Sequence, residues 1–138
     1  MELYKRIIPK LDIKGENLVK GVNLEGLRVL GKPENFASSY YQNGADELIF
    51  QDIISSLYGI KTLEKVIKKT ASEIFIPLTV GGGIKTTKDI YNLLRCGADK
   101  VSINSAAIND SNLIKEAIKL FGSSTIVSSI ETQFIDNN

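Results

Sequence analysis

The feature that most constrains this chain is a regular alternation of short apolar runs with stretches of helical periodicity. Five runs have strand length and many β-branched residues, and they are Arg6 to Leu11, Glu47 to Phe50, Phe75 to Val80, Lys100 to Ile103 and Thr125 to Ile130. Four stretches between them have helical spacing or helix-end signals, and they are Pro33 to Asn43, Thr62 to Glu73, Thr87 to Cys96 and Asp110 to Phe121. Nearly continuous apolar strands that alternate with helices predict an α/β fold with a parallel sheet.

The composition argues against several functional classes. The 138 residues include 17 Lys+Arg and 16 Asp+Glu, a net charge of +1, so we expect no nucleic-acid partner. No apolar run approaches the roughly 18 residues that span a bilayer, and the amino terminus lacks a signal-peptide pattern, so we expect a cytoplasmic protein with no membrane partner. The absence of His and the single Cys96 argue against a disulfide, a zinc site and Ser-His catalysis. We expect neither a metal nor a cofactor.

A short motif occurs twice. Gly44-Ala45-Asp46 precedes the second predicted strand, and Gly97-Ala98-Asp99 precedes the fourth, 53 residues later. This spacing is the length of two βα units and suggests a repeated β-α-β-α quarter. The alternative is that Gly-Ala-Asp is merely a convenient way to end a helix and enter a strand.

The residues that close the predicted strands are the candidate site, because ligands of parallel α/β folds bind beyond the carboxyl ends of the strands. Glycine backbone amides and the positive end of the following helix suit a phosphate. Carboxylates at the same rim suit proton transfer, with Asp12 and Glu131 as an acid/base pair. The alternatives are solvated acids and ordinary turns. The strand-closing residues are Asp12, Asp52, Gly81-Gly82-Gly83, Asn104-Ser105 and Glu131.

A second group of charges is predicted at the opposite end of the strands. Because side chains alternate along a strand, Arg6, Lys10 and Asp12 share one face, and Lys100 lies on the same face of its own strand. Glu47 begins its strand at the same level as Arg6. Three interior charges predict an ion-paired cluster, for which a purely structural plug is the alternative role. Lys10 falls midway along this face, where a charge is costly.

Segments that run through nearly the whole chain resemble the amino-terminal half of the cyclase subunit of imidazole glycerol phosphate synthase. They are RIIPKLDIKG with LVKGVN, GADELIFQDI, FIPLTVGGGI, GADKVSINSAAI and FGSSTIVSSIE. The triple glycine also fits the related sugar isomerase of the histidine pathway, and KGVNLEGLRVLGKP favours the cyclase. The family fold is a parallel (βα)8 TIM barrel. The resemblance therefore implies that residues 1–138 form a single half-barrel, about the first four βα units plus strand five.

The resemblance also implies an activity and partners. The cyclase is a lyase of histidine biosynthesis that uses ammonia from a partner glutaminase. It converts a phosphorylated ribotide substrate into imidazole glycerol phosphate and aminoimidazole carboxamide ribotide.

Matching positions imply individual roles. The catalytic positions are Asp12 and Glu131. The substrate- and phosphate-binding positions are Lys20 in the mobile first loop, Asp52, Gly82, Gly83, Asn104 and Ser105. The positions of the charged gate for ammonia are Arg6, Glu47 and Lys100, and Asp99 lies on the face that contacts the glutaminase.

Two departures from the family pattern leave alternatives open. The second catalytic acid of the family is Asp, and here it is Glu131; Pro9-Lys10 replaces Ala-Cys and places an ammonium group near Asp12. Both changes are similar to cyclase-like paralogues that transfer ammonia to a bacterial surface sugar. A further alternative is a non-catalytic half-barrel that binds phosphate or a partner. Because a half-barrel exposes strand edges and an apolar sheet face, we also expect self-association.

Overall fold

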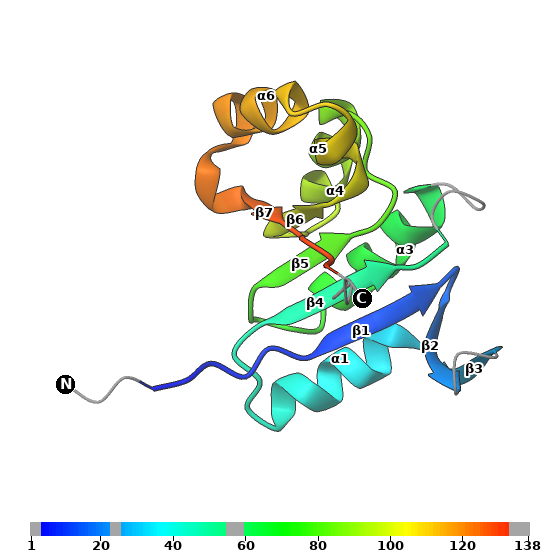
Figure 1. Ribbon diagram of the computed structural model, residues 1–138. Helices are drawn as coiled ribbons and strands as arrows, with labels where there is room; N and C mark the ends of the chain where they lie inside the picture. The colour runs from blue at the N-terminus through cyan, green and yellow to red at the C-terminus, as the bar shows by residue number, and fades with distance from the viewer. Residues whose placement is uncertain (1–3, 23–25, 55–59, 133–138) are drawn as a thin grey trace, which may run out of the picture.

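The structure is a computed structural model that describes residues 4–22, 26–54 and 60–132. Its sheet has the strand order β3-β2-β1-β4-β5-β6-β7 (Figure 1). The parallel strands are β1 (Lys10–Lys14), β4 (Leu48–Asp52), β5 (Leu78–Gly81), β6 (Lys100–Ile103) and β7 (Ile126–Ser128). The helices are α1 (Pro33–Gln42), α3 (Ile60–Ala71), α4 (Thr87–Arg95), α5 (Ser105–Asn109) and α6 (Asn112–Phe121), followed by a 3-10 turn at Ser123–Thr125. No helix within the described ranges has the length and apolar character needed to cross a membrane.

The predicted β-α alternation is confirmed, but several predicted boundaries are wrong. The first strand, predicted at Arg6 to Leu11, begins its ladder only at Lys10. The residues before it are bonded to the approach to β4, where Asp46 N donates to Ile7 O at 3.0 Å and Ile49 N donates to Pro9 O at 2.9 Å. Pro9 has no N–H to continue a ladder. The short helix α5, directly after β6, was not predicted.

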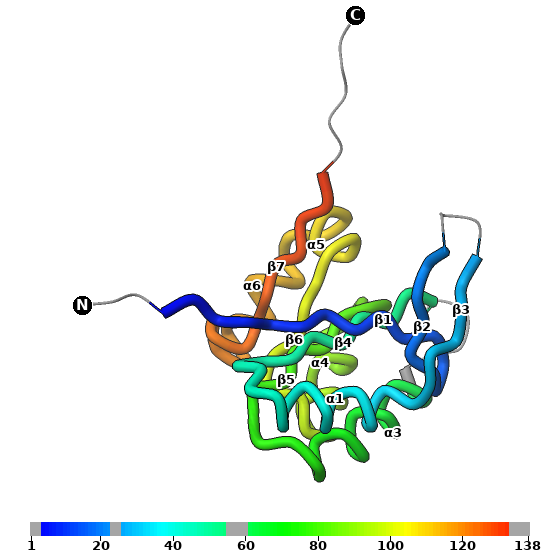
Figure 2. Tube along the Cα trace, turned by 90° about the horizontal axis from the view of Figure 1, so that it is seen from below, coloured from blue at the N-terminus to red at the C-terminus, as the bar shows by residue number. Residues whose placement is uncertain are grey.

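An antiparallel hairpin replaces the loop expected after the first strand. Strand β2 (Asn17–Val22) pairs with β1 and with the edge strand β3 (Gly26–Gly31). Gly15, at φ +61°, lies in the tight turn between β1 and β2, a conformation that glycine adopts without strain. Figure 2 shows the hairpin rising on the side of the sheet away from α1 and α3. Lys20, expected in a mobile loop, lies in β2 and is exposed.

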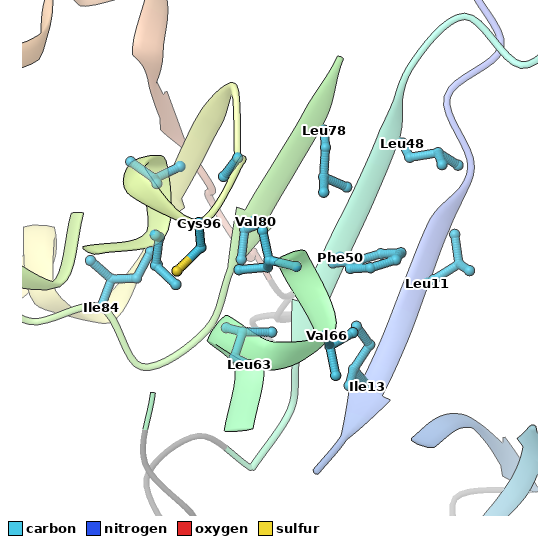
Figure 3. Packing of buried hydrophobic residues seen from close by; sticks show 14 of the residues in the cluster. Leu11, Ile13, Leu48, Phe50, Leu63, Val66, Leu78, Val80, Ile84 and Cys96 are labelled. Atoms are coloured by element: carbon cyan, nitrogen blue, oxygen red, sulfur yellow. The ribbon is translucent and has the colours of Figure 1, made fainter. Parts of the chain in front are cut away.

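One face of the parallel sheet forms the apolar core with the helices. Phe50 and Leu48 of β4 are fully buried, as is Val80 of β5. Figure 3 shows Phe50 and Val80 beside Val66 and Leu63 of α3, with Leu48 farther along β4. Burying side chains of this size contributes roughly 1.5–3 kcal/mol each. The opposite face carries most of the polar side chains of β1, β4 and β6, because side chains alternate, whereas Asp52 at the end of β4 is buried on the helix side.

The two Gly-Ala-Asp motifs form the same structure. Each glycine has positive φ, +87° at Gly44 and +114° at Gly97. In the first motif Gly44 N donates to Tyr41 O at 3.1 Å and Ala45 N to Tyr40 O at 3.0 Å. In the second, Gly97 N donates to Leu94 O at 3.1 Å and Ala98 N to Leu93 O at 3.2 Å. This paired pattern is the Schellman end of a helix.

The aspartate of each motif then binds backbone of a neighbouring segment, the approach to β1 for Asp46 and the start of β5 for Asp99. Asp46 Oδ2 accepts from Ile7 N at 2.6 Å, and Asp99 Oδ2 accepts from Leu78 N at 2.8 Å. Each aspartate also donates its own N–H to the carbonyl of the residue that it holds. Each motif thus ends a helix and anchors the next segment of the sheet, as the simpler interpretation of the sequence expects, and the repeated quarter stays a prediction.

The matched glycines give a test of this geometry. A Cβ at Gly97 would stand 2.6 Å from Ala71 Cβ, whereas a Cβ at Gly44 would meet nothing within 4 Å. We expect Gly44→Ala to lower the free energy of unfolding by about 1–2 kcal/mol, the cost of left-handed backbone. Gly97→Ala is expected to cost about 1–3 kcal/mol more, because it adds a steric clash. Urea denaturation measures both, and equal losses would contradict the close approach of α3 to Gly97.

Candidate functional site

A cavity of about 710 Å³ lies at the carboxyl ends of the parallel strands. The structure brings most of the predicted strand-end residues together around it, whereas Lys20 is not among its lining residues. Five parallel strands that end at one edge of the sheet place the residues that follow them side by side. The predicted residues that line the cavity are Asp12, Asp52, Gly82, Gly83, Asn104, Ser105 and Glu131.

A polar row crosses the sheet at the level of Asp12. The strand register pairs Asp12 with Gln51, Gln51 with Gly81, and Gly81 with Ser102. A Cβ on Gly81 would stand 2.7 Å from Gln51 Oε1 and 3.2 Å from Ser102 Cβ. Gly81 therefore provides the space that the Gln51 carboxamide occupies. Sequence reasoning missed Gln51 and Ser102, which the alternation rule identifies once the register is known.

Asp12 presents a partly shielded carboxylate to the cavity. Its side chain is 46% exposed, yet within the described residues its Oδ1 atom is shielded from solvent and has no hydrogen-bond partner. The Lys10 ammonium lies 3.9 Å from this oxygen, which is too far for a hydrogen bond. Lys10 is therefore near Asp12, as predicted. Its side chain is 54% exposed, so the expected cost of a buried charge does not arise.

Asp52 faces the opposite side of its strand from Gln51. It is 6% exposed, and its Oδ1 accepts a hydrogen bond from Ile54 N at 3.0 Å. Burial raises the pKa of the Asp52 carboxyl, and the bond from the Ile54 amide opposes this effect. Although Asp52 reaches the cavity wall, its carboxylate lies on the helix-facing side of β4. Its predicted contact with substrate stays a prediction.

The glycine-rich turn after β5 needs its glycines. Gly82 and Gly83 have φ values of +111° and +62°, and a Cβ on Gly82 would stand 2.2 Å from Asp52 O. A side chain at Gly82 is therefore excluded by the backbone of β4.

The helix after this turn was expected to offer its positive amino-terminal end to a phosphate, but a carboxylate of the protein already occupies that end. The carboxylate of Asp89, in the first turn of α4, accepts from Lys85 N at 3.1 Å and Thr86 N at 2.9 Å. The Thr86 hydroxyl accepts from Asp89 N in return, which completes a capping box. Because Asp89 occupies this end of α4, an anion in the cavity would rely on the glycine turn and on the residues after β6.

The residues after β6 begin a helix instead of a plain turn. Asn104 is the residue before α5 and makes no side-chain capping bond, and Ser105 is the first residue of that helix. Asn104 is half-buried, Ser105 is exposed, and both line the cavity. Their predicted contact with a phosphate stays a prediction.

At the amino-terminal end of the same sheet face, three charges meet at Glu47. Its Oε1 pairs with the Arg6 guanidinium, and its Oε2 accepts from Lys100 Nζ at 3.0 Å. The Glu47 side chain is only 10% exposed, whereas those of Arg6 and Lys100 are 64% and 30% exposed. The expected ion-paired cluster is present. Its role as a gate stays a prediction.

Comparison with known proteins finds a matching family and curated relatives. The sequence model of the family described as "Histidine biosynthesis protein" matches residues 6–136. A curated relative from Legionella pneumophila is 55% identical over 128 residues, 93% of this chain and 60% of its own length. Another, from Bacillus cereus strain G9842, is 54% identical over 131 residues, 95% of this chain and 52% of its own length. Both are named "Imidazole glycerol phosphate synthase subunit HisF". The chain thus spans 52% to 60% of these relatives.

The Glu47 cluster can be tested by removing one cation. Among the described residues, Lys100→Met leaves the buried Glu47 carboxylate with Arg6 as its remaining ion-pair partner, and we expect a loss of about 1–3 kcal/mol in the free energy of unfolding. The control Lys14→Met removes an exposed charge from β1 and should change stability by less than about 0.5 kcal/mol. Chemical denaturation measures both. Equal losses of stability in the two variants would show that the ion pair with Lys100 does not stabilise the buried Glu47 carboxylate.

Asp52 predicts a specific pH dependence. Because burial raises the pKa of Asp52 above its ordinary 3.8, the folded protein binds this proton more tightly than the unfolded chain. The contribution of Asp52 to stability therefore falls as the pH rises from 3.8 through the folded pKa. Relative to wild type, Asp52→Asn should gain stability between about pH 4 and pH 7. Urea unfolding at a series of pH values checks this, and a constant difference would contradict it.

Proposed function

The chain belongs to the histidine biosynthesis protein family, and from this premise we propose that it supplies the amino-terminal half of a cyclase active site. Its parallel strands are part of a (βα)8 TIM barrel. The reaction would join ammonia to a phosphorylated ribotide substrate, close an imidazole ring, and release imidazole glycerol phosphate and aminoimidazole carboxamide ribotide. The observation that supports this most is the shared sheet face, with acids at one end and an ion-paired cluster at the other.

Asp12 and Glu131 are the proposed acid/base pair. Asp12 lies within β1 and Glu131 follows β7. These two strands are separated by three others in the sheet, and both residues line the cavity. A substrate between them would meet one carboxyl group on each side. One group can accept a proton from the attacking nitrogen while the other donates a proton to the group that leaves.

The cavity wall after β5 and β6 is the proposed phosphate site. Gly82 and Gly83 bring backbone close to the cavity, and Asn104 and Ser105 add an amide and a hydroxyl. Backbone N–H groups and neutral donors of this kind suit a phosphate. The anchored phosphate would fix the reacting part of the substrate over the row that contains Asp12.

The ammonia would enter at the amino-terminal end, beside the Arg6–Glu47–Lys100 cluster. These side chains lie on the same sheet face as Asp12. Ammonia that passes Glu47 therefore arrives on the face that carries the proposed base. We propose a glutaminase subunit as the source, with Asp99, beside Lys100, on the contacting face. The cytoplasmic location and self-association stay predictions.

The relatives' names favour the histidine pathway over the surface-sugar and non-catalytic alternatives. Glu131 still departs from the family's Asp. A displacement of the acid by about an ångström can cost a hundredfold in rate, so the activity of a Glu131→Asp variant is informative.

The proposal predicts ammonium-dependent formation of imidazole glycerol phosphate by the full-length protein that carries these residues. Asp12→Asn removes the proposed base and should lower the rate by about 10²- to 10⁴-fold. Asp110→Asn is the matched control, because Asp110 lines the same cavity but its Oδ1 already accepts from Asn112 N at 2.9 Å. The control should retain activity within about threefold. Product is measured by mass spectrometry.

Absence of product from both wild type and Glu131→Asp would contradict the cyclase activity. Product from Glu131→Asp alone would show that Glu131 blocks this chemistry, and would favour another acceptor for the ammonia.

A further inference from the structure

Lys10 is a charged residue of the cavity to which the proposed reaction assigns no role. It precedes Asp12 by two residues in β1, so both side chains lie on the polar face of the sheet. Both also line the cavity. Its ladder partner in β4 is Ile49, one row nearer the Glu47 cluster than the row of Asp12. Lys10 therefore lies between the proposed ammonia entrance and the proposed base.

Lys10 differs from the other cationic side chains near this face in its ion-pair partner. Arg6 and Lys100 are paired with Glu47. Lys85 also lines the cavity, from the turn after β5, but among the described residues the ion pair to Asp12 comes from Lys10. The other cavity carboxylates are Asp52, Asp110 and Glu131.

The geometry of the Lys10–Asp12 pair leaves one oxygen of the Asp12 carboxylate accessible. Asp12 Oδ1 is shielded from solvent without a hydrogen-bond donor, so the exposed part of the carboxylate is its other oxygen. Lys10 Nζ, 3.9 Å from Oδ1, balances the charge of the shielded oxygen without a hydrogen bond to it. The exposed oxygen stays available for a proton from the substrate.

We propose that Lys10 is a positioning residue for Asp12, which acts by its charge on the shielded oxygen and keeps the exposed oxygen free for proton transfer. This inference rests on the proposed cyclase function. In this proposal Lys10, which departs from the family pattern, acts on the charge of the Asp12 carboxylate.

Three variants of the full-length protein test the role by steady-state kinetics with ammonium. Lys10→Met keeps the length of the side chain without its charge, and we expect kcat to fall about tenfold or more with KM within about threefold. Lys10→Arg keeps the charge and should recover kcat to within about threefold of wild type. Lys14→Met removes a charge from the same strand outside the cavity and should match wild type.

A fourth comparison tests whether Lys10 acts through Asp12. Adding Lys10→Met to Asp12→Asn should cause no further loss of kcat, because the carboxylate charge is already absent. A further tenfold loss would overturn the role. Wild-type kcat in Lys10→Met, failure of Lys10→Arg to recover activity, or an increase in KM alone would also overturn it. An inactive wild type would instead overturn the proposed function, and this role with it.

Discussion

Glu47 connects three parts of the sheet through one buried carboxylate. Its two oxygens pair with Arg6, on the segment that leads into β1, and with Lys100, at the start of β6, while Glu47 itself precedes β4. A buried carboxylate must be compensated, so these segments are held at one end of the sheet face. Asp46 and Asp99 lie directly beside Glu47 and Lys100 in sequence, and they bind backbone of the approach to β1 and of β5. The amino-terminal end is thus fixed by side-chain charge as well as by ladder bonds.

The other end of the face can carry polar residues, because the apolar packing that stabilises the sheet lies on its helix side. Leu48, Phe50 and Val80 are buried against the helices, so the residues between them in sequence are free to be polar. Gly81 lacks a side chain and gives the Gln51 carboxamide its place, and Gly82 lets the next turn pass close to the backbone of Asp52. Because side chains alternate along each strand, one face of the sheet is mainly apolar and packs against the helices, and the other is mainly polar and lines the cavity.

The same alternation explains what the sequence could and could not predict. Helical spacing and β-branched runs located the parallel strands, and parity alone predicted that Arg6, Glu47 and Lys100 would meet. Gln51 was missed because the predicted strand stopped at Phe50, while the ladder continues to Asp52. Asp52 does line the cavity, and its predicted contact with substrate stays a prediction. The strand β2 was missed because the signal for the turn that leads into it is a single glycine, Gly15.

We propose that ammonia moves along the polar face of the sheet from the Glu47 end to Asp12. The most direct test supplies glutamine with ¹⁵N in its side-chain amide to the full-length protein and a glutaminase subunit, in a solution of unlabelled ammonium. We expect the imidazole product to retain most of the ¹⁵N label, because the proposed route carries the nitrogen along the protein. A product whose label is diluted to the solution value would contradict it.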